Sequence, residues 1–83
     1  MFINKSKDGL NNVCGRKVAA LRKSMKPKVS QRALAQKLQV AGLYVDKNAV
    51  QRIESGQRFV TDIELVVLSK VLNVSIETLL TND

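Results

Sequence analysis

The sequence predicts an all-α fold of five short helices in one domain. Apolar residues recur at helical spacing along most of the chain, helix N-caps and glycine stops separate these stretches, and no segment keeps the alternation of a strand. With 83 residues, of which 45% are hydrophobic, the chain can build one small core. We expect a flexible N-terminal arm at residues 1–11, where polar residues mix without periodicity, and one domain at residues 12–83.

Two helices are expected in the N-terminal half. Apolar side chains at i, i+4, i+7 and i+11 from Cys14 mark one face of the first helix, and Pro27 ends it. Ser30 is a favourable N-cap for the second helix, Gln31 to about Val40, and Gly42 is its stop.

The third helix is expected at residues 47–55, between an N-cap at Asp46 and a stop at Gly56. One side is apolar, and the opposite arc, about 140° wide, carries amides, basic groups and a hydroxyl but no acid. An ordinary solvated face, the alternative interpretation, would usually mix Glu with Lys. The residues of this arc are Lys47, Asn48, Gln51, Arg52 and Ser55.

Two more helices complete the expected fold. The capping box Thr61-Asp62-Ile63-Glu64 opens a helix at about residues 62–72, and Ser75 caps the last helix at about residues 76–80.

The fourth helix has two apolar stripes, although a small domain needs one. Leu65, Leu68 and Leu72 are expected in the core. The second stripe either packs internally, under the arm around Phe2 and Ile3, or contacts a partner subunit, and internal packing is slightly favoured. Its members are Ile63, Val67 and Val71.

The charge is unevenly distributed. The net charge is +7, and residues 1–58 hold thirteen of the fourteen basic residues but only three of the seven acidic ones. Such a basic face favours a polyanionic partner, whereas charge that serves solubility alone is the weaker alternative.

The composition argues against an enzyme and against a bound metal or cofactor. One Cys and no His exclude a zinc finger, a Cys–His nucleophile and a Ser–His–Asp triad, and no glycine-rich phosphate loop is present. Cys14 fits a buried core position in a reduced protein. Without a long apolar run or a signal segment, we expect a cytoplasmic protein that makes no membrane contact.

Two consecutive helices with a polar, basic second member are typical of a helix-turn-helix, whose second helix enters the major groove. Asn and Gln can pair with adenine, and Arg and Lys with guanine. In this context residues 15–80 resemble the Cro/CI-type helix-turn-helix proteins, the XRE family with a lambda-repressor-like bundle. The segments that carry the resemblance are VSQRALAQKLQV, NAVQRIESGQR and TDIELVVLSKVLNVSIETLL. The segment at Ala41–Lys47 is about five residues longer than the family's usual connector, and Gln39 stands where Gly is common.

The resemblance implies roles for individual residues. The residues that would read bases are Lys47, Asn48, Gln51 and Arg52. Arg22 would form an ion pair with Glu54. Physical chemistry favours the same pair, because a partly buried carboxylate at the edge of a DNA-facing helix needs a cationic partner. The second helix's N-terminus and the residues after the third helix favour phosphate. The candidate phosphate-binding residues are Ser30, Gln31, Arg32, Ser55, Gln57 and Arg58.

We therefore predict a bacterial or phage transcription regulator that binds double-stranded DNA sequence-specifically, with a repressor as the favoured role. A homodimer is expected, because one recognition helix reads only a few base pairs. The alternative is an antitoxin that binds a partner toxin and its own operator. RNA binding is disfavoured, since three aromatic residues cannot form a stacking platform.

Overall fold

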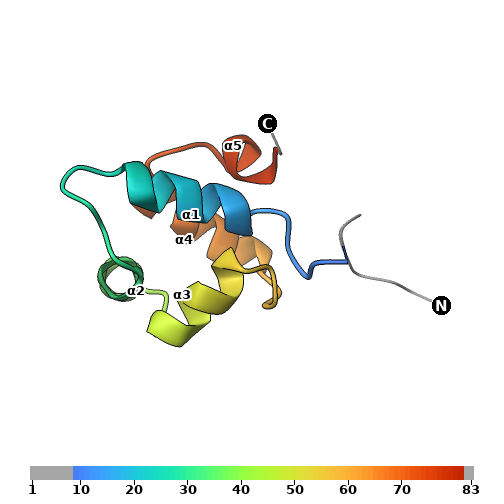
Figure 1. The fold of residues 1–83 in the computed structure, drawn as a ribbon, viewed down its shortest axis with the longest axis horizontal. Coiled ribbons are helices and arrows are strands. Elements are labelled where there is room, and N and C mark those ends of the chain that lie inside the picture. Colours follow the sequence, from blue (N-terminus) through green and yellow to red (C-terminus); the bar gives the residue numbers. More distant parts are fainter. Residues whose placement is uncertain (1–8, 82–83) are drawn as a thin grey trace.

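The computed structural model describes residues 9–81, and over this range the chain forms a bundle of five helices with no strand (Figure 1). The predicted all-α fold is therefore confirmed. The helices are α1 (Gly15–Ser24), α2 (Gln31–Val40), α3 (Lys47–Glu54), α4 (Asp62–Leu72) and α5 (Ile76–Leu80). None of those described helices has the length and hydrophobicity that crossing a membrane requires.

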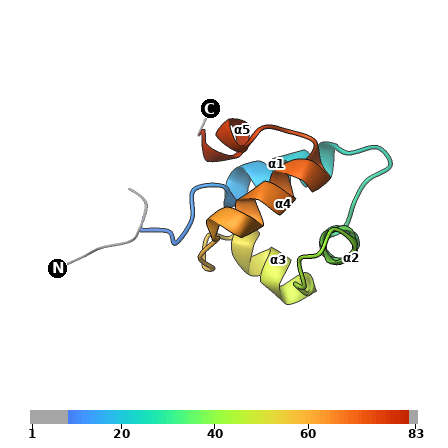
Figure 2. The same ribbon diagram turned by 180° about the vertical axis from the view of Figure 1, so that it is seen from behind.

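The core lies where all five helices meet. In both views of the ribbon α1 and α4 lie together with α5 beside them, and α2 and α3 form the opposite side (Figure 2). Each helix contributes at least one fully buried aliphatic side chain, and each such burial stabilises the fold by about 1.5–3 kcal/mol. These residues include Val18, Leu34, Val50, Leu68 and Leu79.

The predicted caps of α2 and α3 are present. Ser30 Oγ accepts the Ala33 N–H at 3.0 Å, and Asp46 Oδ1 accepts the Ala49 N–H at 2.8 Å. At the other ends, Gly42 and Gly56 adopt φ values of +100° and +83°, which L side chains rarely adopt. The helix expected at residues 47–55 is one residue shorter, because Ser55 is its C-cap.

The Thr61–Glu64 capping box also forms. Thr61 Oγ1 accepts the Glu64 N–H at 3.2 Å, and Glu64 Oε1 accepts the Thr61 N–H at 2.9 Å. Ser75 Oγ accepts the Thr78 N–H at 3.1 Å and so caps α5. Each such cap is worth about 0.5–2 kcal/mol, which fixes where the two C-terminal helices begin.

The end of the expected N-terminal arm is attached to the domain. The Asn11 N–H donates to Gly56 O at 2.8 Å, and Asn11 Nδ2 donates to Gln57 O at 2.7 Å. Asn11 therefore follows the loop after α3 instead of leaving the domain. Residues 1–8, and with them the expected packing of Phe2 and Ile3, lie outside the described residues.

The second apolar stripe of α4 is divided between two environments. Val67 and Val71 are partly buried against the core, whereas Ile63 is 72% exposed. Val66, three residues from Ile63 and therefore its neighbour on the helix surface, is also exposed. The exposed apolar pair on α4 is thus Ile63 with Val66, a pairing that the sequence analysis did not anticipate.

Candidate nucleic-acid interface

The two sides of α3 differ sharply in burial. Ala49, Val50 and Ile53 are buried against the rest of the bundle. The polar residues of the helix other than Glu54, together with its C-cap, are exposed, because a 3.6-residue period places them on the opposite side. This exposed set consists of Lys47, Asn48, Gln51, Arg52 and Ser55. The four expected base-reading side chains thus lie on one solvent-facing surface.

Glu54, the only acid of α3, is held by an ion pair with Arg22 of α1. Arg22 Nε lies 2.6 Å from Glu54 Oε2, and Arg22 Nη2 donates to Glu54 Oε1 at 3.0 Å. Arg22 Nη1 donates to Val29 O at 3.0 Å, and the two side chains are only 11% and 7% exposed. The hydrogen bond with Glu54 raises the pKa of Arg22 further above its usual range. The pair joins α1, α3 and the segment before α2 while neutralising the carboxylate.

The start of α2 is connected to this ion pair. Gln31 Nε2 donates to Glu54 Oε1 at 3.0 Å, which uses one of the two N–H bonds of the amide. Arg32 is exposed beside it, and Ser30 serves as the N-cap. Of the expected phosphate-binding residues at this end, Gln31 is therefore linked to α3 through Glu54, and Ser30 caps α2 itself.

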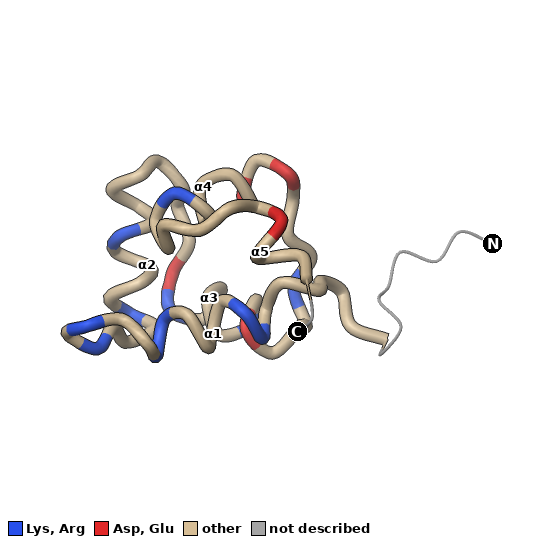
Figure 3. Tube along the Cα trace, turned by 90° about the horizontal axis from the view of Figure 1, so that it is seen from above, with Lys and Arg blue, Asp and Glu red and all other residues tan. Residues whose placement is uncertain are grey.

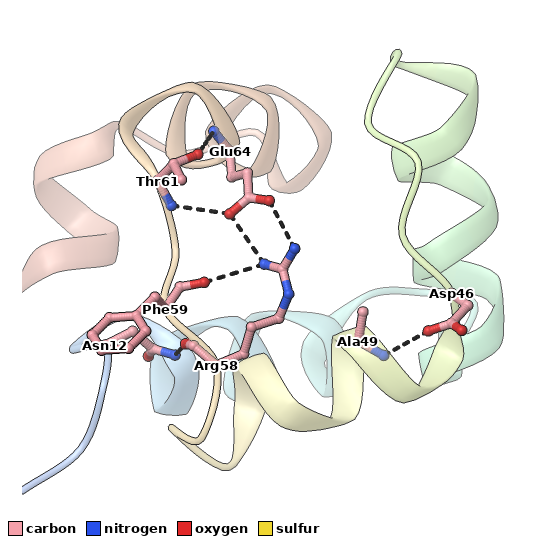
Figure 4. A network of polar contacts seen from close by, with 7 residues as sticks. All are labelled: Asn12, Asp46, Ala49, Arg58, Phe59, Thr61 and Glu64. Atoms are coloured by element: carbon pink, nitrogen blue, oxygen red, sulfur yellow. Dashed lines mark hydrogen bonds and ion pairs between the residues drawn. The ribbon is translucent and has the colours of Figure 1, made fainter.

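The residues after α3 have partners within the protein. Ser55 Oγ donates to Arg52 O at 3.2 Å, and Gln57 is exposed. Arg58, expected at a phosphate, is instead bidentate to Glu64: Nη1 donates to Oε1 at 3.0 Å and Nη2 to Oε2 at 2.9 Å (Figure 4). Nη1 also donates to Phe59 O at 3.2 Å. In the structure Arg58 thus anchors the α3–α4 loop to α4.

The Arg58–Glu64 pair predicts a pH-dependent contribution to stability. Hydrogen bonding to Arg58 is the main cause that lowers the pKa of Glu64 below its usual range. Since the folded-state pKa is the lower one, the contribution is complete above the unfolded pKa and disappears as the pH falls through the folded pKa. We expect Glu64→Gln to cost about 1 kcal/mol at pH 7, because the pair is partly exposed.

Urea unfolding between pH 7 and pH 3 measures this effect. The wild type should lose more stability on acidification than Glu64→Gln does. Glu77→Gln, which removes an exposed acid from α5, is the matched control and should follow the wild type. Equal losses in wild type and Glu64→Gln would show that the pair does not contribute.

Asn12, which the sequence analysis did not single out, joins the start of α1 to the end of α3. Its Oδ1 accepts the Gly15 N–H at 2.8 Å, while its Nδ2 donates to Ile53 O at 3.1 Å and to Arg58 O at 2.7 Å. The spacing from Asn12 to Gly15 is that of an N-cap side chain and the backbone N–H that donates to it, which was the available signal. Asn12 thus holds the C-terminal end of α3 in place.

The long connector between α2 and α3 is also fixed. The Leu43 N–H donates to Leu38 O at 2.8 Å, and Gln39 Nε2 donates to Val45 O at 2.8 Å. Leu43 packs partly against the core and Val45 is buried. Gln39, which stands where the family commonly has glycine, therefore holds the connector by a hydrogen bond. The extra residues of the connector are thus attached to α2 and the core before α3 begins.

Basic residues predominate on the half of the molecule that contains α1–α3. Figure 3 shows Lys and Arg along α1, α2 and the loop that joins them. The two acids of α3 and its N-cap have internal roles: Glu54 binds Arg22, and Asp46 caps the helix. The exposed arc of α3, with Lys47 and Arg52, therefore belongs to the basic half of the molecule.

Two consecutive helices, of which the second exposes amide and guanidinium groups on a basic surface, define a helix-turn-helix DNA-binding domain. A family model described as Helix-turn-helix matches residues 18–79, from α1 to α5. The chain belongs to this family, the XRE-type helix-turn-helix proteins that regulate transcription by binding DNA. No curated protein and no solved structure matches the chain.

Proposed function

We propose that the protein is a sequence-specific transcription regulator that inserts α3 into the major groove of duplex DNA. The exposed arc of α3 carries this proposal, because it presents Lys47, Asn48, Gln51 and Arg52 together and no acid. Asn48 and Gln51 have the donor–acceptor pattern that pairs with adenine, while Arg52 suits guanine. Lys47, at the start of the helix, would contact both a base and a phosphate.

The start of α2 would set the register on the DNA backbone. Its unpaired N–H groups and the positive end of its dipole favour a phosphate, and Arg32 adds a charge. The second N–H of the Gln31 amide would reach the same phosphate while the first stays on Glu54. Because Glu54 belongs to α3, this bond would keep the phosphate contact and the recognition helix at a fixed spacing.

Selection of binding sites from random duplex DNA, followed by α3 variants, tests the proposal. Asn48→Ala, Gln51→Ala and Arg52→Ala should each cost about 1–3 kcal/mol on the selected site and much less on random DNA. Gln31→Ala should weaken both about equally, because phosphate contacts carry no sequence information. Lys70→Ala, an exposed basic residue of α4, is the matched control and should bind like the wild type.

The proposal is wrong if no duplex is enriched, or if all three α3 variants keep the wild-type preference. Salt gives an independent criterion: with about four phosphates neutralised per subunit, log K should fall against log salt with a slope of about −3.6. Binding that does not change with salt would exclude duplex DNA as the main partner.

A repressor acting as a homodimer on a two-fold operator is the form of this function that we propose. Two pairs of exposed apolar residues support a protein contact away from α3: Ile63 with Val66 on α4, and Ile76 with Leu80 on α5. Helices α4 and α5 pack against each other, so both pairs belong to the C-terminal half. A dimer joined there would leave both recognition helices free for DNA.

We expect Ile63→Glu to produce a folded monomer, because the side chain is 72% exposed and its burial is needed only in the dimer. Sedimentation should show the loss of the dimer, and binding should persist on a half-site but fail on a full operator. Val40→Glu, at the end of α2, is the matched control and should remain dimeric. A wild type that stays monomeric, with or without DNA, would contradict the homodimer and direct attention to a different protein partner, as in the antitoxin alternative.

A further inference from the structure

The connector between α2 and α3 exposes an aromatic side chain. Tyr44 is 87% exposed, although its neighbours Leu43 and Val45 both point toward the core. The Val45 N–H donates to Leu43 O at 3.1 Å, so the chain makes a three-residue turn with Tyr44 at its centre. Two inward aliphatic anchors therefore force Tyr44 outward, and its exposure is built into the connector.

The backbone that carries Tyr44 is held on both sides. The Leu43 N–H donates to Leu38 O and Gln39 Nε2 donates to Val45 O, each at 2.8 Å. A ring on so constrained a segment has little freedom beyond its two side-chain torsions, which lowers the entropy lost on contact with a partner. Such a ring is suited to binding.

Tyr44 lies close in the chain to the N-terminal end of α3. It precedes the N-cap Asp46 by two residues and Lys47 by three, so its Cα lies within about 11 Å of that of Lys47. Figure 4 shows the connector descending from α2 to α3 at Asp46. In a helix-turn-helix the N-terminal residues of the second helix contact base edges.

The charge around Tyr44 favours a nucleic acid over other partners. Lys37 and Lys47 flank the connector in the sequence, against the single carboxylate of Asp46, whose Oδ1 accepts the Ala49 N–H. In the major groove, phosphates lie close to apolar groups of the bases. Basic side chains beside an aromatic ring can contact both at once.

We propose that Tyr44 is a further specificity-determining residue, whose ring packs against the C5 methyl group of a thymine at the edge of the segment read by α3. This inference rests on the proposed function. Apolar contact with that methyl group is how proteins distinguish thymine in the major groove without a hydrogen bond. The extra connector residues would thus widen the recognised site.

Replacing single thymines by uracil in the selected site tests the proposal, because the exchange removes only the methyl group. At one flanking thymine the wild type should lose about three- to fivefold in affinity, the effect of one buried methyl-sized group. Tyr44→Ala should bind the thymine site at least that much more weakly and should no longer distinguish uracil from thymine there. This double comparison isolates the contact between the ring and the methyl group.

Two controls separate contact from folding. Tyr44→Ala should melt at the wild-type temperature, since the exposed ring supports no core contact. Val40→Ala, a 91% exposed apolar residue at the end of α2, should keep the discrimination between thymine and uracil. Tyr44 is the only tyrosine and the chain has no tryptophan, so protection of its fluorescence from acrylamide on DNA binding reports this ring alone.

The inference is overturned if Tyr44→Ala selects the same site with the same affinity, or if it weakens thymine and uracil sites equally. Either result leaves the proposed function intact, provided that the α3 variants still change site preference. If the wild type enriches no duplex at all, the proposed function and the role of Tyr44 both fail.

Discussion

Gly15→Ala is expected to destabilise the protein by about 3 kcal/mol, although alanine is the better helix former by about 1 kcal/mol. A Cβ at Gly15 would lie 2.1 Å from Ile53 O and 3.0 Å from Glu54 O. Both atoms belong to the backbone at the end of α3, so no side chain can move aside. The methyl group would have to push α1 away from α3.

Urea unfolding measures this cost, and Ala20→Gly is the matched control. It makes the reverse exchange at an exposed position of the same helix and should cost about 1 kcal/mol from helix propensity alone. A gain in stability for Gly15→Ala would show that the two helices can separate without loss, and would contradict the close contact.

The helices and their boundaries follow from local signals. Ser30, Asp46, Thr61 and Ser75 each cap the helix expected of them, because an N-cap acts on N–H groups only two or three residues away. The two faces of α3 were predictable for a similar reason, since its helical period alone assigns each residue to one side.

Contacts between distant segments were not predictable in the same way. Arg58 pairs with Glu64 because the loop between them folds back, and no periodicity in the sequence indicates that return. Asn12 binds carbonyl groups 41 and 46 residues away. A single polar side chain can bind many backbone groups, so only the packed fold selects its partners.

The connector between α2 and α3 depends both on local signals and on packing against the core. Its apolar pattern covers only Leu43, Tyr44 and Val45, which is too short to predict from the sequence which of the three is exposed. Once Gly42 ends α2 and Asp46 begins α3, however, the two aliphatic residues have the core as their only burial site. The exposure of Tyr44 thus follows from its neighbours.

The contact between Arg22 and Glu54, unlike those of Arg58 and Asn12, was expected from the sequence, and the two side chains form an ion pair in the structure. We expect Glu54→Ala and Arg22→Ala each to cost about 3 kcal/mol or more, since each leaves a buried group without its partner. The double variant should cost less than the sum of the two. The more exposed pair of Arg58 with Glu64 should lose only about 1 kcal/mol in the corresponding variants.

DNA affinity separates the two single variants further. Arg22→Ala leaves a negative carboxylate at the edge of α3 and the Gln31 amide still bound to it, so it should repel the DNA backbone. Glu54→Ala removes that charge and leaves a cation on the basic half. Under conditions where both remain folded, we expect Glu54→Ala to bind duplex DNA more tightly than Arg22→Ala, most clearly at low salt. Equal affinities would mean that the pair acts on stability alone, and the reverse order would contradict the placement of Glu54 at the DNA-facing edge.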